Sequence, residues 1–241
     1  MSDNRYNDED ILSVIDYLKK NGGKKFNFSN LNVASQFYHK TPKGKWVPKT
    51  LMRNREILIL GSGPGVAEHK VALQNFIKNK KPLVLALNIQ KEIESSFIDF
   101  YIACHPVRLL ADAESHSKLS QPLITPASML PKSLIKKLGN KKVFDFGIKI
   151  IPNSFEFHRN HCVIPNSLVI SYALAVCASG ETSKILMAGF DGYQIGDSRN
   201  NEVEEVLSDF YKSEISNISK SIISITPTNF KGLISKSVYG I

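Results

Sequence analysis

The chain has 241 residues, a formal net charge of +9 and 42% hydrophobic residues, which is ordinary for a globular protein. It is long enough for one α/β domain with an appendage. No stretch approaches the roughly 20 apolar residues of a membrane-spanning helix, and the polar start MSDNRYNDED does not resemble a secretory signal. Three cysteines without a CxxC pairing indicate reduced thiols, so we expect a cytoplasmic protein.

Residues 1–50 are predicted to form a helical appendage and a basic linker, and residues 51–241 the main domain. Ile11, Val14, Ile15 and Leu18 have the spacing of one apolar helix face. The positive charge suits anionic ligands of several kinds and does not choose among them. No nucleic-acid-binding module surrounds the densest basic segment, so we expect no nucleic-acid partner there. Its cations are Lys40, Lys43, Lys45, Lys49, Arg53 and Arg55.

From residue 57 onwards, short apolar runs alternate with helical candidates. The runs that predict strands are ILILG (57–61), PLVLALN (82–88), DFYIACH (99–105), PLIT (122–125), KVFDFGI (142–148), KILMAGFDG (184–192) and SIISIT (221–226). Helices are predicted at 66–79, 166–179 and 201–212. Continuous apolar strands that alternate with helices indicate an α/β fold. We expect a doubly wound, mostly parallel, Rossmann-like sheet of six or seven strands.

The glycine-rich turn GSGPG, residues 61–65, connects the first strand to a helix and indicates an anionic ligand. Glycine lets backbone N–H groups approach an anion, and a helix N-terminus adds partial positive charge. The spacing is not GxGxxG, and Asn88 stands where an NAD site has an acidic residue for the ribose. No Gly-Lys-Ser/Thr follows, so a P-loop is excluded. A plain strand–helix turn without a ligand is the alternative.

Ligands of open parallel sheets bind at the carboxyl ends of the strands. Asn166 and Ser167 either cap the next helix or contact a ligand. Arg108 can hold a phosphate or a sugar carboxylate, or lie on the surface without a ligand. His105 is the best candidate for a catalytic base. The predicted site residues are Gly61, Ser62, Gly63, Gly65, Asn88, His105, Arg108, Asn166, Ser167, Asp191, Gly192 and Tyr193.

Other residue types with possible chemistry give weaker signals. His158, His161 and Cys162 in FHRNHC do not have the spacing of a zinc finger, and no fourth ligand is evident. We therefore expect no metal site. Cys104 is expected in the core, because it and the adjacent His105 point to opposite faces of a strand.

Four segments follow the order found in bacterial CMP-sialic-acid-dependent lipooligosaccharide sialyltransferases, which residues 56–235 resemble. The segments are LILGSGPGVAEHK, VLALNIQ, NSLVISYALAVCASGETSKILMAGFDGYQIGD and SITPTNFKGLI. The glycine turn is also similar to that of the hydroxymethylpterin pyrophosphokinase-like domain. The first resemblance implies CMP or a CMP-sugar as the ligand, and no cofactor is assigned. It places Ser62 and Gly63 near the phosphate, Asn88 at the nucleotide, Asn166 and Ser167 beside the ligand, and Asp191 and Tyr193 at the ribose or cytosine.

The chain departs from those sialyltransferases after the FDGYQ segment. In the family, a long lid follows and carries a histidine that acts as general base. Here GFDGYQIGDSRNNEVEEVL passes directly into the next predicted helix, and no histidine follows His161. Losing a general base typically costs 10²–10⁴-fold in rate. The resemblance therefore implies a nucleotide-sugar pocket and leaves transferase activity open.

A second resemblance spans nearly the whole chain. YNDEDILSVIDYLKKNGGKKF, ACHPVRLLAD, PLITPASMLP, AGFDGY and SVYGI are similar to the C-terminal region of bacterial HMG-CoA-lyase-like (4-hydroxy-2-oxovalerate aldolase-like) proteins associated with surface-polysaccharide clusters. It implies an accessory domain with an aldolase barrel as partner. Together, the two resemblances predict nucleotide-sugar binding in surface-polysaccharide biosynthesis, with a non-catalytic accessory domain of an aldolase as the alternative. A pyrophosphokinase would need several carboxylates for Mg²⁺ at the strand ends, where only Asp191 is well placed. Oligomerisation stays open.

Overall fold

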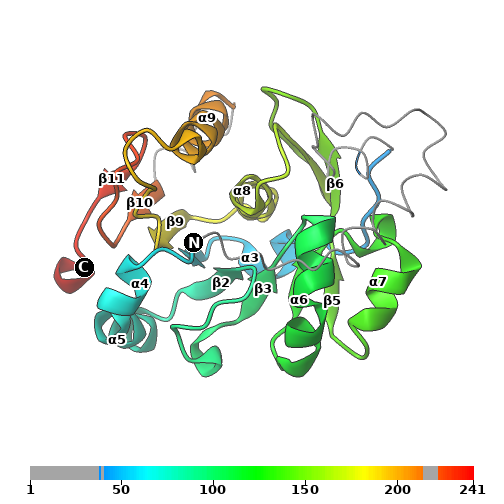
Figure 1. Cartoon of the computed structure of the whole chain (residues 1–241), viewed down its shortest axis with the longest axis horizontal. Helices are drawn as coiled ribbons and strands as arrows, with labels where there is room; N and C mark the ends of the chain where they lie inside the picture. Colours follow the sequence, from blue (N-terminus) through cyan, green and yellow to red (C-terminus); the bar gives the residue numbers. More distant parts are fainter. Residues whose placement is uncertain (1–37, 39–40, 214–221) are drawn as a thin grey trace.

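The computed structural model describes residue 38 and residues 41–213 and 222–241 (Figure 1). The helix predicted within the first 50 residues lies outside this part. Eight strands form one sheet in the order β11-β10-β9-β1-β2-β3-β4-β5, with every neighbouring pair parallel. The strands are β1 (Glu56–Leu60), β2 (Leu83–Leu87), β3 (Phe100–Ile102), β4 (Leu123–Thr125), β5 (Val143–Asp145), β9 (Lys184–Ala188), β10 (Ile222–Ser224) and β11 (Ile234–Ser235). The predicted α/β fold is confirmed, and the short β11 is the strand beyond the expected seven.

Helices cover both faces of this sheet. On the way from β1 to β5 the crossovers carry α4 (Gly65–Glu68), α5 (Lys70–Lys80), α6 (Pro106–Lys118) and α7 (Lys132–Lys137). The chain then returns through α8 (Val169–Ser179) to β9, and α9 (Ser198–Lys212) leads to β10. Because right-handed crossovers that run in opposite directions lie on opposite faces, α8 and α9 pack on the face away from α4 and α5 (Figure 1).

Two of the predicted elements are each divided in the structure. The helix expected at 66–79 is broken at His69, whose φ of −107° and ψ of 18° end α4 before α5 begins. The strand expected at 142–148 becomes β5 and β6 (Gly147–Ile150), which belong to different sheets. Phe146 donates its N–H to Thr125 beside β5, whereas the next residue, Gly147, donates to Asn160. The partner changes between these two residues, so the strand cannot continue in one sheet.

Three strands form a second, smaller sheet that was not expected as a unit. Its order is β6-β8-β7, with β8 (His161–Ile164) parallel to β6 and antiparallel to β7 (Glu156–Phe157). The helix α6 was also not predicted. In the sequence, the predicted strand ends at His105, and Arg108 is predicted as a ligand contact at the carboxyl ends of the strands and not as part of a helix.

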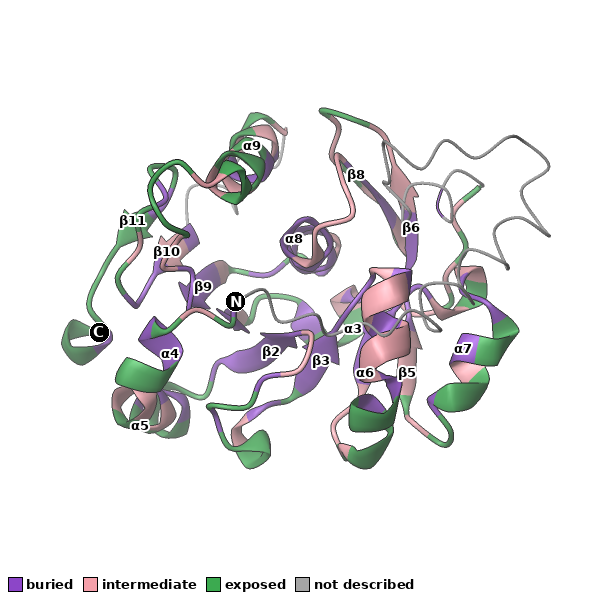
Figure 2. Ribbon diagram, viewed as in Figure 1, coloured by how far each residue is buried: buried purple, intermediate pink, exposed green. Residues whose placement is uncertain are grey.

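The predicted buried helix is confirmed, although it begins three residues later than expected, at Val169. Every residue from Ile170 to Ala178 is buried, and Figure 2 shows α8 enclosed between the main sheet and the smaller one. The thiols of Cys104, Cys162 and Cys177 are free and buried, so the prediction of a core Cys104 holds. No helix in the described ranges is both long and apolar enough to cross a membrane.

The strand order contains a topological switch point between β1 and β9. β2 to β5 follow β1 on one side, whereas β9 to β11 lie on its other side. The side of β1 on which successive strands are added therefore changes between β1 and β9, although all the strands remain parallel. In open α/β sheets, ligands bind outside the carboxyl ends of the strands at such a switch point.

Candidate functional site

A cleft of about 510 Å³ opens at the carboxyl ends of the strands around this switch point. Ten of the twelve residues predicted from the sequence line it, although they come from five separate parts of the chain. They are Gly61, Ser62, Gly63, Asn88, His105, Arg108, Ser167, Asp191, Gly192 and Tyr193. Gly65 and Asn166 do not line it. The structure thus gathers most of the predicted residues around one space, and their contacts divide it into two walls.

The first wall, here called the glycine wall, consists of residues 61–65 and 189–193. The N–H of Gly61 donates to Ala188 at 2.8 Å, and that of Gly63 donates to the carbonyl of Gly189 at 3.0 Å. The Gly65 N–H donates to Oδ1 of Asp191 at 2.9 Å. The three glycine N–H groups of the turn are therefore used inside the protein, and they join the end of β1 to the end of β9.

The carboxylate of Asp191 occupies the position in which the sequence predicts a phosphate. A β-carbon at Gly63 would lie 2.0 Å from its Oδ2, and one at Gly65 would lie 2.4 Å from its Oδ1. Glycine at both positions makes room for this carboxylate. Its Oδ2 is buried and has no hydrogen-bond partner among the described residues. One acceptor atom on the glycine wall is therefore left for a donor from outside the protein.

Gly189 lets the two strand ends approach closely. It has a φ of +75°, and a β-carbon there would lie 2.4 Å from Cγ2 of Val66. Its N–H donates to Oγ1 of Thr226 at 3.0 Å, which ties the end of β9 to the segment after β10. Sequence reasoning did not single out Gly189, although its place at a strand end was a signal that could have identified it.

The second wall, here called the α6–α8 wall, consists of His105, Arg108 and residues 167–170. His105 is the N-cap residue of α6, and Pro106 takes the first helical position. Burial, and secondarily the charge of Arg108, lowers the pKa of His105 from its ordinary value, so the imidazole is neutral near neutral pH. Its Nδ1 is buried without a partner in the described part of the chain. Arg108 donates through Nε to Asp112 at 2.8 Å, which fixes the direction of its guanidinium.

The start of α8 forms the rest of this wall. Asn166 accepts from the Leu168 N–H at 3.1 Å and from the Ser171 hydroxyl at 2.7 Å through the same Oδ1. These bonds hold the turn before α8, but they reach the N-cap residue and a side-chain hydroxyl and are not a side-chain cap of the helix. The N-cap residue itself, Leu168, supplies no side-chain cap. The N–H groups in the first turn of a helix have no partner within the helix, and this one has eleven residues.

Seven apolar residues that the sequence does not single out also line the cleft, and they come from several elements. They are Leu87, Leu168, Val169, Ile170, Phe190, Val203 and Phe230. Phe190 directly follows β9, so the strand-end rule could have identified it. Val203 lies on α9 and Phe230 after β10, and only the tertiary packing brings them here. The cleft thus has a polar side at His105 and Arg108 and an apolar side that suits a flat ring.

The segment between β9 and α9 is short, as the sequence indicates. Asp197 caps α9 by accepting from the Arg199 N–H at 3.0 Å. The Arg199 guanidinium lies over the Tyr193 ring, 4.0 Å from its centroid, and Asn200 accepts from the Tyr193 N–H at 2.8 Å. The bonds to Arg199 lower the pKa of Asp197 to about 2. These contacts hold Tyr193 at the rim of the cleft.

The histidines of FHRNHC lie away from this cleft. His158 and His161 stack with ring centroids 4.3 Å apart, and Cys162 is buried and directed at the Gly147 carbonyl. In the described ranges, no group of three or more His, Cys, Asp or Glu side chains is arranged to hold a metal ion.

Comparison with known proteins finds a similarity in three-dimensional structure. No protein-family model matches the chain, and no curated protein matches it either. Among solved structures, it matches the MAf glycosyltransferase from Magnetospirillum magneticum AMB-1 with a TM-score of 0.58 and 10% sequence identity. The match covers 98% of this chain and 43% of that one, so this chain spans less than half of its length. At this identity the likeness shows a shared fold, and the resemblances to sialyltransferases, aldolase-associated proteins and pterin proteins stay predictions.

Proposed function

We propose that this chain binds a nucleotide-activated sugar in the cleft at the switch point, and that the preferred form is an acidic sugar linked to CMP. The proposal places this activity in bacterial surface-polysaccharide synthesis. The observation that carries it is the unequal pair of walls. The glycine wall already contains a carboxylate, whereas the α6–α8 wall offers Arg108 and the start of α8.

The carboxylate of Asp191 favours a ligand with few phosphates. A diphosphate seated on the glycine turn would place negative charge against a carboxylate that the Gly65 N–H already holds. A hydroxyl group is a better neighbour, because Oδ2 of Asp191 lacks a donor in the described part of the chain. A ribose hydroxyl at Oδ2 is consistent with the contact that the sialyltransferase resemblance implies for Asp191.

The negative charge of the ligand belongs on the opposite wall. The guanidinium of Arg108 can bind a phosphate or a sugar carboxylate, and the positive end of the α8 dipole adds to this attraction. The apolar side of the cleft can hold the base against Phe190 and Phe230. The likeness to a protein named as a glycosyltransferase supports the assignment to sugar chemistry.

Calorimetric titration with CMP, CDP, ATP and NAD tests the proposal. We expect CMP to bind more tightly than CDP or ATP, and no binding of NAD. Arg108→Gln should weaken CMP binding by about 10–100-fold, because a charge-assisted hydrogen bond is lost. Arg159→Gln removes the same charge from an exposed site outside the cleft and should change little. Asn88→Ala and Asp191→Ala should each weaken binding as well.

Two results would contradict this function. CDP binding at least as tightly as CMP would mean that Asp191 does not limit the number of phosphates. If none of the nucleotides binds to a chain that unfolds cooperatively, the glycine turn serves architecture alone, and the accessory-domain alternative becomes the one to pursue.

We further propose His105 as the base for any transfer of the sugar to an acceptor. A neutral imidazole at the cleft can accept the proton of an attacking hydroxyl. Release of CMP from CMP-sialic acid should rise with pH through the lowered pKa of His105 and be level at neutral pH. His105→Gln should reduce this rate by about 10²–10⁴-fold while the dissociation constant of CMP stays within a fewfold of wild type. An unchanged rate excludes His105 as the base.

A further inference from the structure

The end of the molecule that contains α7 is rich in lysine. Residues 115–155 contain seven lysines, no arginine and a single acidic residue, Asp145. That carboxylate is buried and accepts from both the N–H and the hydroxyl of Ser128, at 2.9 and 2.5 Å. It therefore presents no negative charge to the surface, and the lysines around it stand without acidic neighbours from their own segment.

The lysines of this end come together from three elements. Lys132, Lys136 and Lys137 are exposed on α7, and Lys142 is exposed just before the edge strand β5. Two more exposed lysines arrive from the start of the described chain, where the Lys43 N–H contacts Met129 Sδ and the Lys45 N–H donates to the Asp145 carbonyl. We call these six residues the lysine face.

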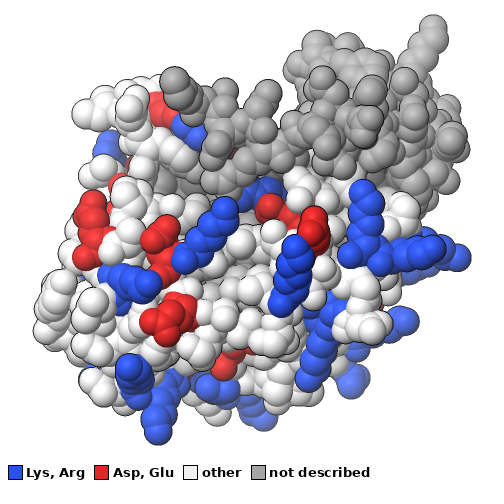
Figure 3. Space-filling model, turned by 60° about the horizontal axis from the view of Figure 1, so that its bottom comes forward, with Lys and Arg blue, Asp and Glu red and all other residues white. Residues whose placement is uncertain are grey.

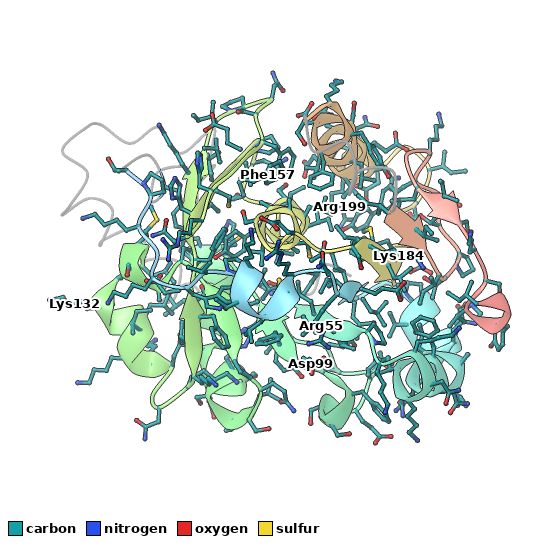
Figure 4. All side chains as sticks on the ribbon, turned by 180° about the vertical axis from the view of Figure 1, so that it is seen from behind. Arg55, Asp99, Lys132, Phe157, Lys184 and Arg199 are labelled. Atoms are coloured by element: carbon teal, nitrogen blue, oxygen red, sulfur yellow. The ribbon has the colours of Figure 1, made fainter. Side chains whose placement is uncertain are left out.

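The figures show where charged side chains lie on the molecule. In Figure 3, blue side chains dominate the right-hand side of the molecule, whereas red ones gather towards the left and centre. In Figure 4, Lys132 points outwards at one end of the molecule, while Lys184 and Arg199 lie on the other side of α8. The net charge of the chain is therefore distributed unevenly.

The residue types favour a lipid surface over nucleic acid. Lysine is a strongly hydrated point charge on a flexible stem, whereas planar bidentate recognition of phosphate favours arginine. The aromatic rings beside the face are not free to stack on bases, because Trp46 and Phe144 are half-buried and pack against each other at 4.9 Å. A single lysine at the edge strand would be enough to prevent edge-to-edge pairing, so this role does not explain the three on α7.

We infer that the lysine face binds the surface of an anionic phospholipid membrane. Each lysine close to such a surface strengthens adsorption by about fivefold, and four or more together give reversible binding at moderate salt. The attraction is electrostatic and is screened as the ionic strength rises. This inference does not depend on the ligand of the cleft.

Co-sedimentation of the full chain with lipid vesicles tests the inference. We expect binding to vesicles of phosphatidylcholine with phosphatidylglycerol, none to phosphatidylcholine alone, and release between about 0.05 and 0.5 M salt. Replacing Lys132, Lys136, Lys137 and Lys142 together with Gln should lower the partition coefficient by about 100–1,000-fold. The matched control replaces Lys80, Lys91, Lys231 and Lys236 with Gln, which removes the same charge from exposed positions outside the face. It should lower binding less than threefold.

Each other outcome overturns the inference. No binding of the wild-type chain to anionic vesicles rejects it directly. Equal losses in the two quadruple variants mean that net charge acts without a defined face. Tighter binding to an RNA or DNA oligonucleotide than to vesicles, lost in the first variant only, assigns the face to nucleic acid instead. Circular dichroism and urea unfolding of both variants show whether they remain folded.

Discussion

The two walls of the cleft differ in which of their polar groups already have hydrogen-bond partners within the chain. On the glycine wall, the N–H groups of Gly61, Gly63 and Gly65 all donate to acceptors of the chain itself. On the α6–α8 wall, the Nδ1 of His105 is buried without a partner in the described ranges, and the N-cap residue of α8 supplies no cap. Both walls contain a turn before a helix, yet the glycine N–H groups of the first are used within the chain, and the free group on that wall is an acceptor, Asp191 Oδ2.

This difference shows that a motif alone does not decide what a helix start binds. The anion at the glycine turn is the side chain of Asp191, which lies 126 residues further along the chain. A local sequence window contains no sign of it. We therefore expect substitutions on the glycine wall to act first on stability, and substitutions on the α6–α8 wall to act first on ligand binding.

The largest effect is expected for Gly65→Ala. The new β-carbon would lie 2.4 Å from Asp191 Oδ1, and the three atoms nearest to it all belong to that carboxylate. We expect the free energy of unfolding to fall by about 3 kcal/mol, because the carboxylate must move and loses its hydrogen bond. Urea unfolding measures this. In an Asp191→Ala background the same substitution should be neutral or slightly stabilising, because alanine is the better helix former.

Gly240→Ala is the matched control for this cycle. A β-carbon there meets no atom within 4 Å, so stability should stay within about 0.5 kcal/mol of wild type. A cost for Gly65→Ala that is equal in both backgrounds would show that backbone conformation, and not Asp191, requires the glycine. The proposed plan of the glycine wall would then be wrong.

A smaller effect is expected from His116, which anchors α6 behind the second wall. Its side chain is fully buried against Tyr101, with neither ring nitrogen bonded in the described part of the chain, and burial lowers its pKa to about 4. Below its unfolded pKa of about 6.5 the unfolded chain binds a proton that the folded chain does not. Stability is therefore full above about pH 6.5 and falls as the pH drops towards 4. The loss should reach about 2 kcal/mol at about pH 5.

Unfolding curves between about pH 7.5 and 5 check this expectation. His116→Leu should remove that part of the pH dependence. His158→Gln replaces an exposed histidine and should retain it. A variant at His116 that keeps the full loss of stability on acidification would place the responsible group elsewhere.

The sheet and most of the residues of the cleft could be predicted from the sequence, but the difference between the two walls could not. Apolar runs and strand-end positions predicted the parallel sheet and ten residues of the cleft, because both follow from local pattern and from the geometry of parallel strands. The position of Asp191 at the glycine turn and that of Phe230 in the cleft depend on how segments distant in sequence pack. The change of sheet at Phe146 depends on the distant acceptors, Thr125 and Asn160, that the N–H groups of Phe146 and Gly147 meet.

Asn166→Ala is expected to have the smallest effect on stability, and it tests directly whether the start of α8 contributes to ligand binding through this residue. It removes the acceptor of the Leu168 N–H and of the buried Ser171 hydroxyl, so stability should fall by about 1 kcal/mol. The affinity for CMP should change less than twofold, because Asn166 does not line the cleft. Asn166→Asp keeps an acceptor at a helix N-terminus and should restore stability. Loss of CMP affinity as large as that of Arg108→Gln would instead return Asn166 to the ligand contacts that the sialyltransferase resemblance implies. The hydrogen bonds from Leu168 and Ser171 to Asn166 would then exist only when no ligand is bound.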